Sequence, residues 1–345
     1  MTTIDTRAAA RLLLAIAVLV FSPHRVVADP TQIIGPESCG ECHKAAVATW
    51  SHTKHSTAFN KLHRMPEAKE IARKMGIRRI KGDPLCQTCH FTVQLEEGKR
   101  RAKAIAGTSC ESCHGPAKQW RHLHNDYGGQ GATRETETPE HRRARLEKTA
   151  ELGMIRPDHR YEMVSNCFQC HTVPNEELVN TGGHTAGSEF ELVAWSQGEV
   201  RHNFFISNGR ENRAAPRELD PKKYLRFKYV LGRLMDLEYG LRAAAKATQP
   251  GAYIDAVKKR VEKSRGRLEQ ILAQSGDQQL KELIDSVLLS LNGVEIKPDN
   301  PALLLEAADG AQRVARGFAA DFAGSALDGV NALLPPESAY KRSDD

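Results

Sequence analysis

Apolar residues in the last third of the chain recur at steps of three and four, the spacing that places them on one face of a helix. Three such stripes cover residues 227–241, 254–272 and 280–291. Asp220-Pro221 and Asn300-Pro301 each place a proline directly after a capping residue, which is typical of a helix start. The helix that starts at Pro301 is rich in alanine and is expected to end near Gly324. We therefore expect an antiparallel bundle of three or four helices within residues 217–334.

Residues 29–216 have a different pattern, because glycine, proline and polar loops separate short apolar runs. One helix is well marked, with Thr138 as its N-cap, Pro139 at its first position and Gly153 beyond its end. Its residues are almost all polar, so it should lie on the surface. The last segment, 335–345, is polar and is expected to be a disordered tail.

Residues 1–28 have the pattern of a secretory signal peptide. Arg7 and Arg11 precede a ten-residue apolar run, and Ala28 supplies the small residue before a cleavage point. The apolar run is too short to cross a bilayer, although an uncleaved N-terminal anchor is the alternative interpretation. The pattern predicts a periplasmic protein that is soluble and has no membrane span after cleavage.

The sequence Cys-x-x-Cys-His occurs four times and uses all eight cysteines of the chain. At this composition roughly 0.01 copies would arise by chance, and the pattern is the attachment signature of c-type haem. The alternatives are four disulfides, zinc sites or a thioredoxin-type redox pair, none of which requires a histidine after every second cysteine. We therefore expect four covalently attached haem c groups, each containing iron. The thioether cysteines are Cys39, Cys42, Cys86, Cys89, Cys110, Cys113, Cys167 and Cys170.

All cysteines and all histidines beyond the leader lie before residue 217. This break in composition predicts a tetrahaem cytochrome c domain over 29–216 and a separate helical domain over 217–334. Aromatic residues make up only 6% of the chain, so the haems themselves would supply most of the core of the first domain. The predicted fold class is mainly α, with little regular structure around the haems and a C-terminal antiparallel helical bundle.

The formal net charge of +6 gives no support for nucleic-acid binding. Removing the leader lowers the charge, and eight ionised haem propionates would contribute about −8 against about +1 for each ferric porphyrin. The holoprotein would then be close to neutral. No interleaving of basic and aromatic residues is visible either, so no nucleic-acid partner is expected.

The histidine of each motif follows the second cysteine directly and should be the proximal iron ligand. These four residues are His43, His90, His114 and His171. Nine other histidines remain beyond the leader as candidates for the opposite side of the irons: His52, His55, His63, His122, His124, His141, His159, His184 and His202. An iron with two histidines carries electrons, whereas an iron with a free sixth position can bind a small molecule.

The first and third motifs, with their flanking residues, resemble the cytochrome c-554 family of tetrahaem cytochromes. That family is related in haem packing to hydroxylamine oxidoreductase and cytochrome c nitrite reductase. The first match is Cys39–His43 followed by Lys44-Ala45, Trp50 and His55; the second is residues 107–116 followed by His124. The resemblance covers roughly residues 36–205 and is loose in the fourth motif, and the C-terminal helices are longer than the family pattern requires.

The resemblance implies an exchange of ligands between the first and third haems. His55 would bind the iron of His114, with His52 as its rival, and His124 would bind the iron of His43, with His122 as its rival. The family takes the ligand of the fourth haem from a segment after the fourth motif, which implies His202 or His184, with His202 preferred. The second haem is five-coordinate in the well-known members, although here His184, His159 or His63 could reach it.

Two functions agree with these features. The first is a periplasmic electron carrier that transfers electrons between redox partner proteins, a donor and an acceptor. The alternative is a redox enzyme that acts on hydroxylamine, nitric oxide, nitrite or another small nitrogen or sulfur compound at a five-coordinate haem. No motif departs from Cys-x-x-Cys-His and no cysteine is spare, so the sequence favours the carrier and indicates no catalytic residue. The C-terminal helices would be a docking or oligomerisation module or a scaffold packed on the haem domain.

Overall fold

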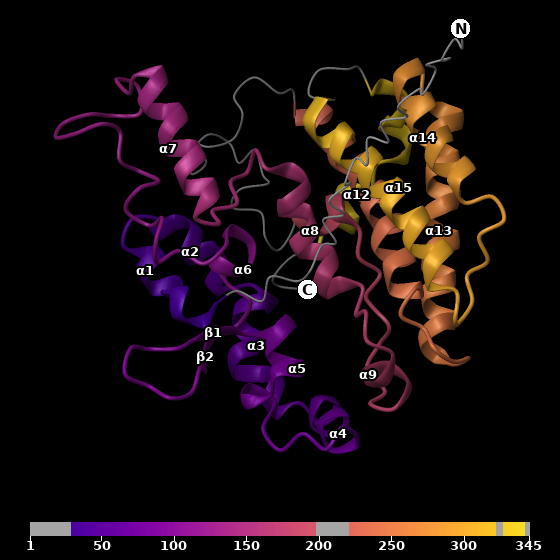
Figure 1. The fold of residues 1–345 in the computed structure, drawn as a ribbon, viewed down its shortest axis with the longest axis horizontal. Coiled ribbons are helices and arrows are strands. Elements are labelled where there is room, and N and C mark those ends of the chain that lie inside the picture. Colours follow the sequence, from indigo (N-terminus) through magenta and orange to yellow (C-terminus); the bar gives the residue numbers. More distant parts are fainter. Residues whose placement is uncertain (1–28, 198–220, 322–326, 342–345) are drawn as a thin grey trace, which may run out of the picture.

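The computed structural model describes residues 29–197, 221–321 and 327–341. Two regions are distinct in Figure 1. The haem-binding region, residues 29–197, has short helices and long connections, and the helical bundle, residues 221–321, has four long helices. The helix that bears the fourth motif, α8 (Arg160–His171), lies between them. The boundary predicted at residue 216 lies outside the described residues, as do the signal peptide and Asp220.

The haem-binding region has one small sheet and many short helices, as the sequence predicts. Strands β1 (Thr92–Gln94) and β2 (Lys103–Ala106) pair antiparallel, with a register shift between Thr92 and Val93. The other elements up to the third motif are η1 (Pro30–Gln32), α1 (Pro36–Gly40), α2 (Lys44–Ser51), α3 (Lys54–Lys61), η2 (Leu62–Arg64), α4 (Pro66–Lys74), η3 (Ile80–Gly82), α5 (Pro84–His90) and α6 (Cys110–His114). Those that follow are α7 (Pro139–Glu151), α8, α9 (Glu176–Asn180) and α10 (Leu192–Ser196).

Helix α7 confirms the start and end signals predicted from the sequence. It begins at Pro139, the Thr138 hydroxyl accepts a hydrogen bond from the backbone N–H of His141, and Gly153 beyond the end has a positive φ of 89°. A left-handed residue after a helix is usually glycine, because glycine has no Cβ to clash. Most of α7 is exposed, as predicted for a polar surface helix.

The helical bundle consists of α12 (Pro221–Ala244), α13 (Ala252–Gln274), α14 (Gln278–Ser290) and α15 (Pro301–Asp321). Helix α12 packs against α13 and α15, and α14 packs against both of those helices. The predicted stripes are buried in α13, through residues such as Val257 and Leu268, and in α14, through Leu280 and Ile284. The sequence thus predicted the helices correctly.

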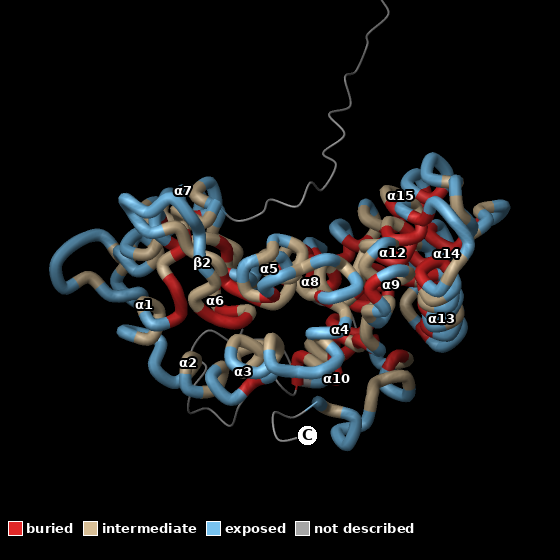
Figure 2. The backbone as a smooth tube through the Cα atoms, turned by 90° about the horizontal axis from the view of Figure 1, so that it is seen from below, coloured by how far each residue is buried: buried red, intermediate tan, exposed pale blue. Residues whose placement is uncertain are grey.

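Helix α12 differs from the one-sided stripe that its sequence indicates, because residues 226–241 are all buried (Figure 2). The bundle covers one side of this helix, and α8 and α10 of the haem-binding region cover another. The glycine at position 232 allows this approach, since a Cβ there would lie 2.9 Å from the Cβ of Leu192 in α10. The buried residues of α12 include five charged ones: Arg226, Lys228, Arg233, Asp236 and Glu238.

One hydrophobic core joins the two regions. Tyr161, Val164 and Phe168 of α8 belong to the same buried cluster as the apolar residues of the bundle. Such continuity agrees with the scaffold interpretation of the C-terminal helices. Among the described residues, no helix is both long and apolar enough to cross a membrane.

The end of the chain differs in part from the predicted disordered tail. After η4 (Asp328–Leu333), residues 337–339 form η5 (Glu337–Ala339), and Tyr340 packs against the core. The backbone N–H of Lys341 donates to the carbonyl of Ala194 in α10. Apolar contact by Tyr340 and this hydrogen bond hold a segment whose composition alone indicated no structure.

Candidate haem-binding site

Each motif occupies a single turn of helix, which brings its two cysteines and its histidine to one side. Residues three and four positions apart in a helix are neighbours on its surface. The second, third and fourth motifs end α5, α6 and α8. The first motif continues beyond α1, where the backbone N–H groups of Cys42 and His43 both donate to the carbonyl of Cys39.

A single cavity of about 2350 Å³ runs between the motifs, and it is lined by all eight cysteines and by the four motif histidines. A pocket for one drug-sized ligand measures roughly 300–1,000 Å³, so this cavity is larger than one such group needs. Aromatic side chains from both regions contribute to the wall, including Trp50 and Phe91 of the haem-binding region and Tyr239 of the bundle. The size of the cavity and the paired thiols around it fit several porphyrins.

The motifs lie close to one another around this cavity. The thiols of Cys39 and Cys110 are in hydrogen-bond contact, so the first and third motifs lie side by side. The Asn166 side chain donates to the carbonyl of Cys113 at 2.9 Å and joins the fourth motif to the third. The Thr108 hydroxyl donates to the carbonyl of Cys89 at 3.0 Å and joins the second motif to the third.

Three motif histidines each face a second imidazole at nearly the same distance. Two imidazole nitrogens about 2 Å from one iron, on opposite sides, would place the ring centroids about 6 Å apart. The pairs are His43 with His124 at 6.1 Å, His55 with His171 at 6.1 Å, and His90 with His184 at 6.3 Å between centroids. A porphyrin supplies four of the six ligands of an iron, so a pair of facing histidines can supply the other two.

Several of these imidazoles are oriented by a hydrogen bond at Nδ1. His114 donates to the carbonyl of Ile155 at 2.9 Å, and His124 donates to the carbonyl of Arg121 at 2.5 Å. A carbonyl can only accept, so Nδ1 carries the proton and Nε2 keeps its lone pair. This is the usual arrangement around metal-binding histidines.

Burial favours the neutral form of three motif histidines, which are His90, His114 and His171. It lowers the pKa of His90 to about 4 and that of His171 to about 3, with smaller contributions from neighbouring histidines. Burial also lowers the pKa of His114. A neutral imidazole is the form that binds a metal ion, so these side chains are ready ligands at pH 7.

No disulfide joins any of the eight cysteines, all of which lie within the described residues. Burial raises the pKa of Cys86 and of Cys113 to about 11 and that of Cys167 to about 12. Within residues 29–197, 221–321 and 327–341, no group of three or more His, Cys, Asp or Glu side chains converges on one point. The pairs of thiols and the facing imidazoles around the cavity fit haem as the bound group.

The structure differs from the predicted exchange of ligands at one point. His124 lies beside His43, where the resemblance places it, but His55 faces His171 of the fourth motif. We expected His55 at the iron of His114. The rival His52 is exposed and does not line the cavity, which leaves His55 as the candidate from this segment.

The other predicted ligands have different positions. His184, a candidate for the fourth haem or the second, faces His90 of the second motif. His202, the preferred candidate for the fourth haem, lies outside the described residues. His122 lines the cavity but is exposed. Ligation by His55, His124, His184 and His202 stays a prediction.

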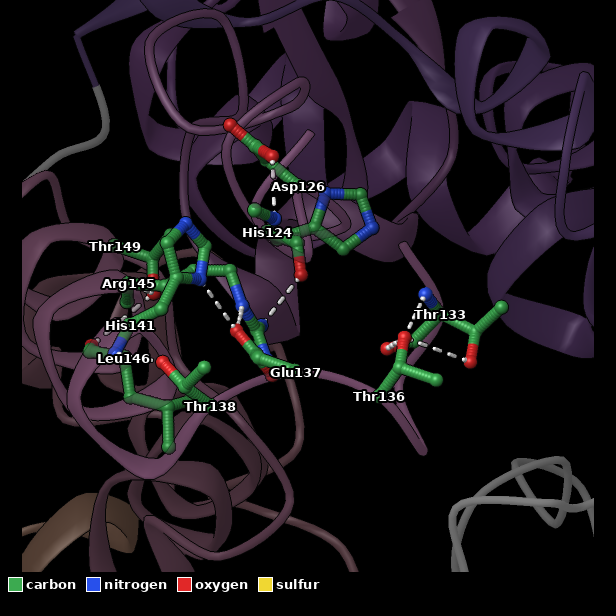
Figure 3. A network of polar contacts seen from close by, with 11 residues as sticks. His124, Asp126, Thr133, Thr136, Glu137, Thr138, His141, Arg145, Leu146 and Thr149 are labelled. Atoms are coloured by element: carbon green, nitrogen blue, oxygen red, sulfur yellow. Dashed lines mark hydrogen bonds and ion pairs between the residues drawn. The ribbon is translucent and has the colours of Figure 1, made fainter. Parts of the chain in front are cut away.

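A polar network outside the cavity holds the backbone of His124 (Figure 3). The Arg145 guanidinium donates from Nη1 to the His124 carbonyl at 2.7 Å, and from Nε to Glu137 Oε1 at 2.7 Å. Nδ1 of His141 lies 2.9 Å from the same carboxylate, whose side chain is 1% exposed. No sequence pattern indicated this network, because its members are residue types that are common on protein surfaces.

The Glu137 carboxylate should make this network sensitive to acid. Hydrogen bonds from Arg145, and then from His141, lower the pKa of Glu137 from 4.5 to about 2. A carboxyl with a lowered pKa in the folded state contributes stability above about pH 4.5, and this contribution is lost as the pH falls toward 2. Glu137→Gln should therefore lower the free energy of unfolding at pH 6, and the difference from the unaltered protein should vanish toward pH 2. Denaturant titrations of the holoprotein between pH 6 and 2.5 measure it, with Glu140→Gln on the exposed face of α7 as the control. A difference that is independent of pH would contradict the role of the carboxylate.

Glu111, inside the third motif, is a residue that the sequence did not single out. Its carboxylate accepts hydrogen bonds from the backbone N–H groups of Ile34, Gly35 and Ala117, the shortest at 2.8 Å. The residue is 3% exposed. Two of its partners precede the first motif, so Glu111 fastens the first motif to the third.

Comparison with known proteins agrees with this geometry. Residues 38–115 match the family model described as cytochrome c554 and c-prime. Cytochrome c-554 of Nitrosomonas europaea is 29% identical over 122 residues, which cover 34% of this chain and 52% of that protein. Dissimilatory sulfite reductase MccA of Wolinella succinogenes is 53% identical over 30 residues, which cover 9% of this chain and 4% of that protein. The chain thus spans about half the length of the first relative and a small part of the second. No solved structure matches the chain.

Proposed function

The chain belongs to the cytochrome c-554 family through residues 38–115, and on this premise we propose that it is a tetrahaem c-type cytochrome that carries electrons between redox partner proteins. The observation that carries the proposal is the single cavity lined by all four Cys-x-x-Cys-His motifs. Four separate pockets would isolate the cofactors, whereas one cavity keeps them close enough for electrons to pass along a chain.

Different residues of the site have different roles in binding the haem groups. The cysteine pairs tether each porphyrin, and the motif histidines bind the irons. Bound haem iron supplies one-electron transfer at a potential that the axial ligands, burial and nearby hydrogen bonds set. Carbonyl groups such as those of Ile155 and Arg121 fix the orientation of the ligating imidazoles through Nδ1.

Contacts between the motifs support a route for electrons within the protein. The first and fourth motifs both contact the third, and the second contacts it through the hydroxyl of Thr108. The third motif would thus be the branch point of the haem chain. Electrons would enter from a donor protein at one exposed edge and leave to an acceptor at another. The signal-like leader supports a place in the periplasm for this exchange.

The helical bundle would act as the scaffold of the fourth haem. The hydroxyl of Tyr161 in α8 donates to the Glu238 carboxylate of α12 at 2.8 and 2.9 Å. Arg160 Nη1 donates to the carbonyl of Ala319 in α15 at 3.0 Å. These bonds and the shared hydrophobic core hold the fourth motif against the bundle, so the bundle and the haem region would work as one unit.

The haem count tests the proposal directly. A pyridine haemochrome assay, together with the intact mass of the mature holoprotein, should give four haems per chain. The double variant Cys110→Ala/Cys113→Ala should give three, because it removes one pair of tethers. Potentiometric titration of the unaltered protein should take up four electrons per chain. Two or fewer haems, or a holoprotein that does not exchange electrons reversibly, would overturn the proposed function.

A further inference from the structure

His184 is brought to the second motif by a loop that belongs to a distant part of the chain. Its ring centroid lies 6.3 Å from that of His90, and both residues line the common cavity. The distance equals, within 0.2 Å, those of the His43–His124 and His55–His171 pairs. No histidine lies between His90 and His114 in the sequence, so a ligand opposite His90 has to come from elsewhere.

The imidazole of His184 has the orientation of a ligand. Its Nδ1 lies 2.8 Å from the carbonyl oxygen of Thr185. Nδ1 must donate there, because the carbonyl cannot, and Nε2 keeps its lone pair. Nδ1 of His114 and Nδ1 of His124, two other histidines of the cavity, also donate to backbone carbonyl groups.

The backbone of the loop is held firmly on α9. The N–H groups of Gly182, Gly183 and His184 donate to the last carbonyls of that helix, each at 3.1 Å. Gly183 has a positive φ of 77°, which L side chains rarely adopt. A Cβ on Gly182 would lie 3.1 Å from the side chain of Met75, directly after α4. The loop therefore packs on the segment that precedes the second motif.

The helical bundle in turn anchors α9. The Glu176 carboxylate accepts hydrogen bonds from the backbone N–H groups of Thr248 and Gln249, between α12 and α13. The Asn180 side chain accepts from the backbone N–H of Tyr253 at 2.9 Å. Both ends of α9 are thus fastened to the bundle, and its C-terminal loop points back to the haem region.

The other two histidines considered for this site are placed differently. His159 lines the cavity, but its Nε2 lies 2.8 Å from Nη2 of Arg156 and accepts a hydrogen bond from it. His63 is not among the residues that line the cavity. His184 is therefore the residue that the geometry favours.

We propose that His184 is the sixth ligand of the second haem iron, opposite His90, and that the helical bundle holds it there through α9. This inference rests on the proposed function, because it requires a haem at Cys86 and Cys89. His184 would then occupy the sixth position of this iron. A redox enzyme would need that position free to bind a small nitrogen or sulfur compound. Ligation by His184 also gives the bundle a role at the second haem, in addition to its role at the fourth.

Binding of carbon monoxide to the reduced holoprotein tests this assignment. His184→Ala should bind one more CO per chain than the unaltered protein, and its oxidised form should show one additional high-spin haem by EPR. Added imidazole should return that haem to the low-spin state. Glu177→Ala, at an exposed position of α9, should leave both measurements unchanged. His184→Met, which keeps a ligand of similar length, should remain low-spin and raise one midpoint potential.

Haem attachment separates failure of this inference from failure of the proposed function. Each His184 variant is first checked for four haems by intact mass, and the Cys86→Ala/Cys89→Ala background for three. In the background Cys86→Ala/Cys89→Ala, which lacks the second haem, His184→Ala should add no CO-binding site. A four-haem His184→Ala protein that binds no more CO than the unaltered one would overturn the inference and leave the proposed function intact. An added CO site that persists without the second haem would assign His184 to another iron, which also overturns it.

Discussion

Replacing Glu111 by alanine is expected to lower the free energy of unfolding of the holoprotein by about 3 kcal/mol or more, since each buried group that loses its hydrogen-bond partner costs about 1–3 kcal/mol. The carboxylate accepts from the N–H groups of Ile34, Gly35 and Ala117, and all three would lose their acceptor together. Haem attachment should persist, because the third motif keeps its cysteines and its histidine. The effect should appear in guanidinium denaturation followed by far-UV circular dichroism and by Soret absorption.

Two variants give this measurement its control. Glu37→Ala changes an exposed glutamate in the first turn of α1, near the same segment, and should alter stability by no more than about 0.5 kcal/mol. Glu111→Gln keeps an acceptor of similar shape, so its free energy of unfolding should lie between those of Glu111→Ala and Glu37→Ala. Equal stability of Glu111→Ala and Glu37→Ala would mean that the first and third motifs are held together by other contacts.

Replacing Glu238 by alanine should be similarly costly, by about 3 kcal/mol, the lower end of what breaking a buried charged pair costs. The residue is fully buried and accepts from the Tyr161 hydroxyl and from Arg242. Arg242 would keep its bond to Asp309, which limits the loss. Because Tyr161 lies on α8, the contact between the fourth motif and the bundle should weaken first.

Denaturation of the holoprotein, followed separately at the Soret band and by helical content, measures this effect. Glu262→Ala, an exposed position on α13, is the matched control and should stay within about 0.5 kcal/mol of the unaltered protein. Glu238→Gln should lose less than Glu238→Ala, because the amide still offers an acceptor to Tyr161. A loss confined to helical content, with unchanged Soret behaviour, would contradict a scaffold role for the bundle at the fourth haem.

Features that depend on neighbouring residues were predicted well from the sequence. The capped start of α7 at Thr138 and the buried stripes of α13 and α14 are set by spacings of a few residues. The stripe of α12 was recognised, but its full burial was not. A helix that is covered on several sides requires partners from other regions, and a one-dimensional pattern does not show them.

The hydrogen-bond partners of the buried polar groups could not be predicted from the sequence either. Nothing near Glu111 marks it as the acceptor for a segment 76 or 77 residues earlier. The pairing of His55 with His171 rather than His114 likewise depends on how the helices of four motifs pack together. Family resemblance supplied candidates for these ligands, but it could not place them around this cavity.

The sequence by itself predicted covalently bound haem c and its candidate attachment points, because two thiols and a histidine within five residues require no more than one turn of helix. It also determined the helices of the bundle, whose apolar spacing is local. Only the tertiary structure decided which second histidine faces each motif. His184 meets His90 because α9 is fastened to the bundle and its loop packs on α4, contacts that exist only once distant segments have folded together.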